Sequence, residues 1–262
     1  MGQVFINKMK TTSNFCRGFH FSIISNMAIW QYILLFSSVF LGGLSSFFFK
    51  DHSKTNLSLI LSFSGAYIIG ISALHLIPET FTGGEPRLGI WLLVGFFSQL
   101  ILDQLSTGVE HGHIHVHHDV GRFFIFRIML GLGVHSFMEG LPLSINALGF
   151  EHSQLYWGII LHEIPAAFAL VALLTLSKVP RNTVLVLLII YASMSSFGAM
   201  SGHYLGWNVA FAKELMALVI GTFLHISTTI LFETDSSHHH QIPWQKLMVI
   251  AFGLFIAVMT MH

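Results

Sequence analysis

A histidine and a glutamate one helical turn apart are the residues of this sequence best suited to chemistry. They belong to the segment His135-Ser136-Phe137-Met138-Glu139-Gly140, which lies within a strongly apolar stretch. Residues i and i+4 share one face of an α-helix, so the His135 and Glu139 side chains can bind the same ligand. Ionisable groups deep inside an apolar segment are costly in a membrane and therefore indicate function. Because imidazole and carboxylate suit zinc and similar divalent ions, the pair predicts part of a metal site.

A third candidate ligand, His162, lies in the next apolar segment and is followed directly by a glutamate. We expect the two segments to be antiparallel neighbours joined by a loop centred near Phe150. Glu139 lies eleven residues before that point and His162 twelve after it, so these side chains share a depth. His135 can join them, whereas the position opposite His135 holds Ala166. Three protein ligands leave an exchangeable position, which a transport site needs.

Two prolines lie close to these candidate ligands. Pro142 removes the backbone hydrogen bond to the carbonyl of Met138, and Pro165 removes the bond to the carbonyl of Leu161. Each freed carbonyl directly precedes a candidate ligand. Irregular helix at membrane depth is tolerated where it lines a cavity or an ion path. A kink that serves packing alone is the alternative for each proline.

The elements that must position these residues are membrane-spanning helices. The 262-residue chain is 53% hydrophobic and only 9% charged, whereas a soluble domain is about 25% charged. A single cysteine, Cys16, excludes an internal disulfide and a cysteine-type zinc site. No basic patch points to nucleic acid. The pattern predicts an all-α polytopic membrane protein with eight transmembrane helices of about 20 residues, at residues 28–49, 57–78, 88–107, 123–146, 154–176, 182–202, 208–231 and 246–262.

The connections between the predicted spans leave no room for a soluble domain. We predict one transmembrane domain over residues 27–262. Residues 1–26 are expected to be a non-native or mobile tail, because Met27 begins a segment that would itself make a sensible start. The longest connection is a His-rich loop at 108–121.

Histidines outside the two apolar segments have a functional and a structural interpretation. His75 and Glu79, one turn apart near the end of the second span, are candidates for a cation entrance or an ordinary interfacial helix end. His203 and His225 are expected to form interhelical hydrogen bonds, and the run 238–240 to be a soluble loop or a weak metal site. His-rich tracts bind zinc whatever their purpose, so we expect metal at His111, His113, His115, His117 and His118.

The placement of lysine and arginine predicts the orientation in the membrane. The loops after the second, fourth and sixth spans carry two of these residues, Arg87 and Lys213. The alternate loops carry seven, so we expect both His-rich loops in the cytoplasm and the C-terminus outside, in a plasma membrane or bacterial inner membrane. Lys8, Lys10 and Arg17 in the tail oppose this orientation. The seven residues are Lys50, Lys54, Arg122, Arg127, Lys178, Arg181 and Lys246.

Taken in order, these segments resemble the ZIP (Zrt/Irt-like) family of divalent metal ion transporters over all eight spans. His135–Gly140 is similar to the His-Ser-x-x-Glu-Gly form of the family's fourth-helix signature, and His162–Phe168 is similar to its fifth-helix signature. The His-rich loop between the third and fourth predicted spans is also similar to the family pattern. Supporting similarities are Gly65-Ala66 through His75-Leu-Ile-Pro78-Glu79, Ser195-Ser196 with Gly198 and Gly202, and Gly221-Thr-Phe-Leu224 leading to Glu233.

The resemblance implies uptake of a divalent metal ion into the cytoplasm, usually zinc, with iron, manganese or cadmium as further substrates. The metal is then the transported substrate, and no resident cofactor is expected. The resemblance also implies an inverted repeat that relates the first and last three spans around spans four and five. It implies a moving bundle of spans one, four, five and six, and often a homodimer.

The sequence departs from the family pattern in both signatures. The second His-Glu pair of the fifth helix is replaced by Ala166-Ala167, and Ser136 stands where an asparagine often helps to hold a second ion. We therefore expect one primary metal, with Glu163 as a secondary ligand or proton acceptor and Ser136 as a weaker ligand. The primary ligands are His135, Glu139 and His162.

Two other function classes could use the same residues. An intramembrane zinc hydrolase usually has His-Glu-x-x-His on one helix, but residues 162–166 lack the second histidine, and His135 and Glu139 would have to complete the site. A metal exporter or sensor is the other class. Common cation exporters carry a soluble C-terminal domain, whereas we expect a span that reaches His262. The sequence therefore favours a transporter that is not an enzyme, with metal ions and the lipid bilayer as its partners.

Overall fold

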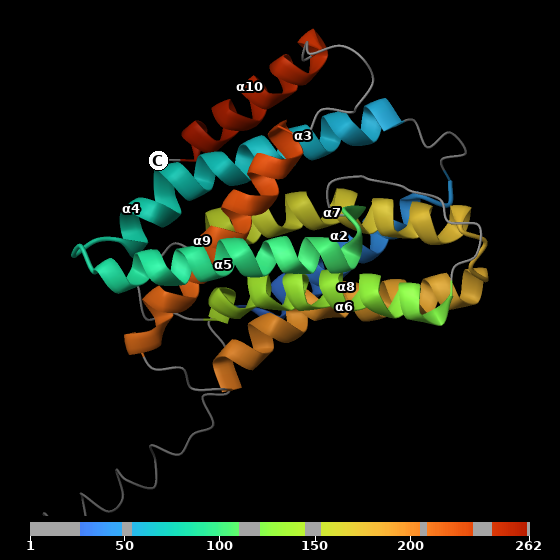
Figure 1. Ribbon diagram of the computed structural model, residues 1–262, viewed down its shortest axis with the longest axis horizontal. Helices are drawn as coiled ribbons and strands as arrows, with labels where there is room; N and C mark the ends of the chain where they lie inside the picture. The colour runs from blue at the N-terminus through green and yellow to red at the C-terminus, as the bar shows by residue number, and fades with distance from the viewer. Residues whose placement is uncertain are drawn as a thin grey trace, which may run out of the picture.

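The described part of the chain is all-helical, so the predicted all-α class is confirmed (Figure 1). The computed structural model describes residues 27–48, 54–109, 121–144, 153–204, 209–232 and 243–260, and these contain no strand. The predicted tail, 1–26, and nearly all of the His-rich loop lie outside the described residues. The histidines of the two predicted His-rich loops also lie outside the described residues: His111, His113, His115, His117, His118, His238, His239 and His240.

The helical elements follow the order of the predicted spans. The second span is built from α3, a π-helical turn and α4, which run on without a break. The bounds are α2 (Ile29–Ser45), α3 (Lys54–Ile71), the π-helical turn (Ser72–Leu76), α4 (Ile77–Thr80), α5 (Pro86–Ser106), α6 (Arg122–Gly140), a 3₁₀ turn (Leu141–Ser144), α7 (Ser153–Leu176), α8 (Arg181–Tyr204), α9 (Val209–Phe232) and α10 (Trp244–Met259).

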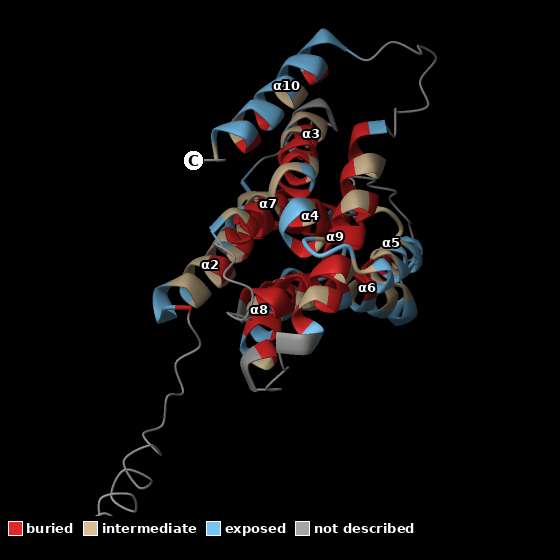
Figure 2. Ribbon diagram, turned by 90° about the vertical axis from the view of Figure 1, so that its left-hand side faces the viewer, coloured by how far each residue is buried: buried red, intermediate tan, exposed pale blue. Residues whose placement is uncertain are grey.

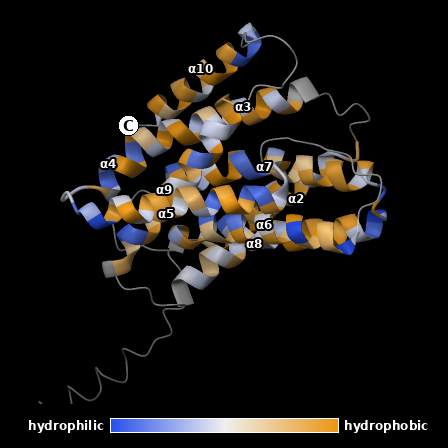
Figure 3. Cartoon of the chain, in the orientation of Figure 1, coloured by the Kyte–Doolittle hydropathy of each residue, from blue (hydrophilic) through white to orange (hydrophobic). Residues whose placement is uncertain are grey.

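Among the described residues, six helical segments are long and apolar enough to cross a membrane, judged by length and composition. α2 and α10 are apolar but shorter, with 17 and 16 residues. Large apolar side chains such as Phe97, Phe126 and Phe252 are exposed on the outer surface, and hydrophobic residues run along the helices there (Figure 3). Such a surface suits lipid. These features support an integral membrane protein, and the count of eight spans stays a prediction.

The centre of the molecule is formed by α7 and α9. In each, 72% of the most apolar window is buried inside the protein, compared with 22% for α5. Figure 2 shows α7 and α9 coloured largely as buried, with many exposed residues on outer helices such as α5 and α10. Most side chains on α7 therefore face other helices, so α7 can carry polar groups away from lipid.

Glycines bring α6 and α8 into close backbone contact. A Cβ atom added at Gly140 of α6 would lie 2.1 Å from the carbonyl oxygen of Ser195 on α8. A Cβ atom added at Gly198 of α8 would lie 2.1 Å from the carbonyl oxygen of Phe137 on α6. Small residues commonly allow membrane helices to approach in this way. The contact fixes the segment from Phe137 to Gly140, and therefore Glu139, against α8.

The second span contains an irregular turn directly before Pro78. The backbone N–H of Ile77 donates to the carbonyl of Ser72, a bond one residue longer than in an α-helix. Proline lacks an N–H and crowds the turn that precedes it, so a π-helical turn is a compatible local solution. His75 lies in this turn and Glu79 follows in α4.

Candidate metal centre

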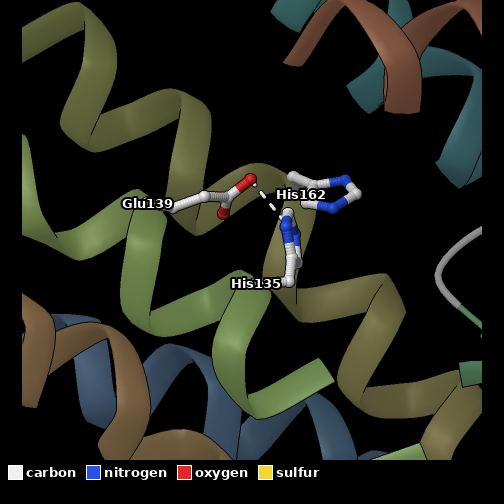
Figure 4. Close-up of side chains that lie close together, drawn as sticks. All are labelled: His135, Glu139 and His162. Atoms are coloured by element: carbon white, nitrogen blue, oxygen red, sulfur yellow. Dashed lines mark ion pairs between the residues drawn. The ribbon is translucent and has the colours of Figure 1, made fainter. Parts of the chain in front are cut away.

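Three buried side chains from α6 and α7 form a compact group of potential metal ligands (Figure 4). α6 supplies His135 and Glu139, and α7 supplies His162. One ligand atom from each lies within 4.8 Å of the others. His135 Nε2 is 3.1 Å from Glu139 Oε1, and the two imidazole rings meet edge to face with centroids 5.8 Å apart. In the described part of the chain, no other group of three His, Cys, Asp or Glu residues meets this spacing.

Burial makes this group suitable for a cation. The exposed fractions are 1% for His135 and 0% for Glu139 and His162. A carboxylate removed from water is costly unless a positive charge compensates it. Glu139 also lies in the last turn of α6, where the helix dipole is negative and favours cations. Two imidazoles and one carboxylate are a common ligand set for zinc with an open position.

The structure places the two prolines differently from each other. α6 ends at Gly140, so Pro142 lies in the 3₁₀ turn that follows and does not interrupt the helix at Met138. Pro165 lies inside α7, which continues to Leu176, and its side chain is buried. Pro142 therefore helps to end the helix directly after Glu139.

Glu163 lies outside this group and forms a separate buried cluster with two serines. Its Oε1 accepts a hydrogen bond from Ser136 Oγ at 2.5 Å, and both carboxylate oxygens lie 2.6 Å from Ser195 Oγ. The two hydroxyl oxygens are 2.8 Å apart. The three residues come from α6, α7 and α8 and are completely buried. This cluster ties the three helices together beside the candidate metal ligands, and a ligand role for Glu163 or Ser136 stays a prediction.

We expect Ser195→Ala to destabilise the protein. A buried hydrogen bond to a charged group contributes about 1.5–3 kcal/mol, and Glu163 would lose one of its two hydroxyl donors. The loss can be measured as a lower melting temperature in detergent. Ser196→Ala is the matched control, because the half-buried Ser196 donates only a 3.2 Å bond to the Tyr32 carbonyl. Equal melting temperatures for the two variants would contradict the assigned role of Ser195.

Other predicted residues lie elsewhere. The structure does not bring His75, which is half-buried, or Glu79, which is exposed, into the metal group. His225 on α9 packs edge to face on Phe96 of α5, with ring centroids 5.0 Å apart, so it makes an interhelical contact and is not part of the group. The side chain of His203 lies outside the described residues.

The prediction from sequence missed Gln99. This residue lies on α5, is completely buried, and has its Oε1 3.0 Å from His135 Nδ1. An amide in the middle of an apolar span is a signal of the same kind as a buried histidine, since it also needs a partner. The sequence does not reveal which helix faces it.

Comparison with known proteins adds independent information. Residues 111–261 match the family described as ZIP zinc transporter. The chain is 27% identical over 201 residues to zinc transporter ZIP9-A of Xenopus laevis, covering 66% of this chain and 65% of that protein. It is 29% identical over 171 residues to zinc transporter ZIP9 of Xenopus tropicalis, covering 60% and 55%. It is 24% identical over 256 residues to zinc transporter ZIP1 of Danio rerio, covering 78% and 84%. The chain thus spans between 55% and 65% of the length of these two ZIP9 relatives.

Proposed function

The chain belongs to the ZIP family of zinc transporters, and we propose that it carries divalent metal ions across a membrane, with zinc as the preferred ion. The observation that supports this most directly is the convergence of three buried ligands, His135, Glu139 and His162, on two apolar helices. The names of the relatives, which describe zinc transporters, support the choice of ion.

We propose uptake toward the cytoplasm. A hydrated ion enters from outside, where His75 and Glu79 can attract it, and exchanges waters for the three ligands. Glu139 supplies the negative charge that compensates the partly dehydrated ion. The imidazoles bind only when deprotonated, so occupancy falls at acidic pH. The ion then leaves inward, where histidines of the loop at 108–121 receive it.

We also propose the inverted repeat around α6 and α7, with eight spans in all. The repeat relates α2, α3 and α5 to α8, α9 and α10, and it exchanges α6 with α7. If the repeat is present, each helix contact in one half should have an equivalent contact in the other half. The equivalent of the α5–α9 contact is the α10–α3 contact. The equivalent of the α6–α8 contact is the α7–α2 contact. All four pairs are packed together, which supports the proposal. We further propose that the protein forms a homodimer in a plasma membrane or bacterial inner membrane. Its His-rich loops would then lie in the cytoplasm and its C-terminus outside.

Hydrolysis is the weaker alternative. A His-Glu-x-x-His zinc hydrolase needs a histidine where this chain has Ala166. The glutamate that would act as the base is Glu163, and it is held by the hydroxyls of Ser136 and Ser195. Transport therefore accounts for more of the buried polar groups.

The proposed function is tested by the direction of zinc movement. Cells that express the chain and carry a zinc-sensitive dye are expected to show a rise in cytoplasmic zinc when zinc is added outside. Competition by iron, manganese and cadmium would then rank the substrates. Cells that express His162→Ala at equal membrane levels are the control. A fall in cytoplasmic zinc would indicate export, and no change relative to empty cells would overturn the proposal.

A further inference from the structure

Gln99 is buried beside the metal ligands although it belongs to another helix. It lies near the middle of α5, the helix with the smallest buried share among the six candidate spans. Its own exposed fraction is 0%. Burial of an amide is costly unless it is hydrogen-bonded, and its carbonyl oxygen faces His135 Nδ1 at 3.0 Å. α5 packs beside α6, so this bond connects α5 to the metal site.

The direction of this bond determines where the imidazole proton lies. An amide oxygen can only accept, so the nitrogen that faces it must carry the proton. A neutral imidazole has one N–H, and a proton on Nδ1 leaves the lone pair on Nε2. Nε2 is the atom of His135 that lies 3.1 Å from Glu139 Oε1. When an ion occupies the site and His135 is neutral, the lone pair therefore points toward the space shared by Glu139 and His162.

We propose that Gln99 is a positioning residue of this site, whose amide oxygen accepts the Nδ1 proton of His135 and directs the Nε2 lone pair at the transported ion. The proposal rests on the proposed function of the three ligands. Such outer partners fix the tautomer and ring orientation of a metal-binding histidine. Without Gln99, the imidazole is free to rotate or to carry its proton on Nε2, where it blocks the ion.

The neutral amide also sets the charge of the loaded site. A divalent ion with the single carboxylate of Glu139 leaves a net charge of +1. A carboxylate in place of the Gln99 amide would still accept the Nδ1 proton, but it would neutralise the site and make His135 a stronger ligand. Gln99 therefore favours binding while allowing release.

The test uses two substitutions at the same position. Zinc influx is measured against zinc concentration in proteoliposomes containing the full chain. We expect Gln99→Leu to raise the KM by about tenfold or more. We expect Gln99→Glu to restore a KM at or below that of the unmodified protein, with a lower maximal rate because the ion is held more tightly. Gln104→Leu, an exposed glutamine of the same helix, is the control and should leave both parameters unchanged.

The outcomes separate this proposal from the proposed function. An unmodified KM in Gln99→Leu would overturn the positioning role while zinc influx still supported transport. An equal loss in Gln99→Leu and Gln99→Glu would also overturn it, because only packing would then matter. If Gln99→Leu fails to fold, Gln99→Glu still tests the proposal. A KM above that of the unmodified protein, or an unchanged maximal rate, would then overturn it. No influx in the unmodified protein would instead refute the proposed function.

Discussion

Replacement of Glu139 by alanine is expected to abolish zinc uptake while the protein stays folded. Glu139 is the only carboxylate among the three converging side chains, so its loss leaves two neutral imidazoles for a partly dehydrated dication. Breaking a buried charge pair by removing one partner costs about 3–5 kcal/mol. Such a loss corresponds to at least a hundredfold weaker binding, at about 1.4 kcal/mol per factor of ten. Glu139→Gln should also fail, because it keeps the shape and removes the charge.

Although both Glu139 variants should lose zinc uptake, we expect neither to lose thermal stability. In the absence of metal, Glu139 is a buried carboxylate, and its replacement by a neutral residue removes a desolvation cost. We therefore expect melting temperatures at or above that of the unmodified protein without zinc. Added zinc should raise the melting temperature of the unmodified protein by mass action and leave Glu139→Ala unchanged.

Matched measurements make this prediction decisive. Zinc uptake by cells and thermal unfolding in detergent should be compared at equal membrane levels. Glu85→Gln is the control, because Glu85 lies outside the spans in the loop before α5. Like Glu139, Glu85 carries a carboxyl group. Arg87 lowers the pKa of Glu85 by hydrogen bonding and by charge, which favours its ionised form. Glu85 is remote from the three candidate ligands along the chain. Normal zinc uptake in Glu139→Ala would refute the metal-site assignment.

The helices and the main site geometry could be predicted because both depend on local sequence. Apolar stretches set the helical segments, and counting residues from the loop near Phe150 was enough to bring His162 to the depth of Glu139. Pro142 explains why α6 ends soon after Glu139. The last residue of α6, Gly140, also depends on packing against α8.

The contacts around the ligands could not be predicted in the same way. Gln99 and His135 are separated by 36 residues, and Ser136 and Ser195 by 59. Their approach depends on which helices are neighbours and on how each helix is rotated about its axis. A single sequence specifies neither quantity. Ser195 was noted for its resemblance to the family pattern, but its bond to Glu163 appears only in the structure.

Gly198→Ala is expected to disrupt both the fold and transport. The added methyl carbon would lie 2.1 Å from the carbonyl oxygen of Phe137, far inside the usual contact distance of about 3.5 Å. A backbone oxygen cannot rotate away as a flexible side chain can, so α6 and α8 must separate. Overpacking of this kind costs about 1–3 kcal/mol.

The separation would move the proposed metal ligands, because Phe137 lies between His135 and Glu139 on α6. Functional sites tolerate displacements of only about 0.5 Å, so zinc uptake should fall by about tenfold or more even in protein that reaches the membrane. The 2.8 Å contact between the hydroxyl oxygens of Ser136 and Ser195, which also joins α6 to α8, would lengthen with the same movement.

Gly133→Ala is the matched control for this variant. Gly133 lies on the same α6, and a Cβ atom there would meet only the Met194 side chain at 3.7 Å, an ordinary contact. Alanine also favours helix over glycine by about 0.5–1 kcal/mol, so this variant should be as stable as the unmodified protein or slightly more. A melting temperature and zinc uptake in Gly198→Ala equal to those of Gly133→Ala would contradict the assigned contact. If only Gly198→Ala is impaired, the backbone contact between α6 and α8 is what holds His135 and Glu139 in register with His162.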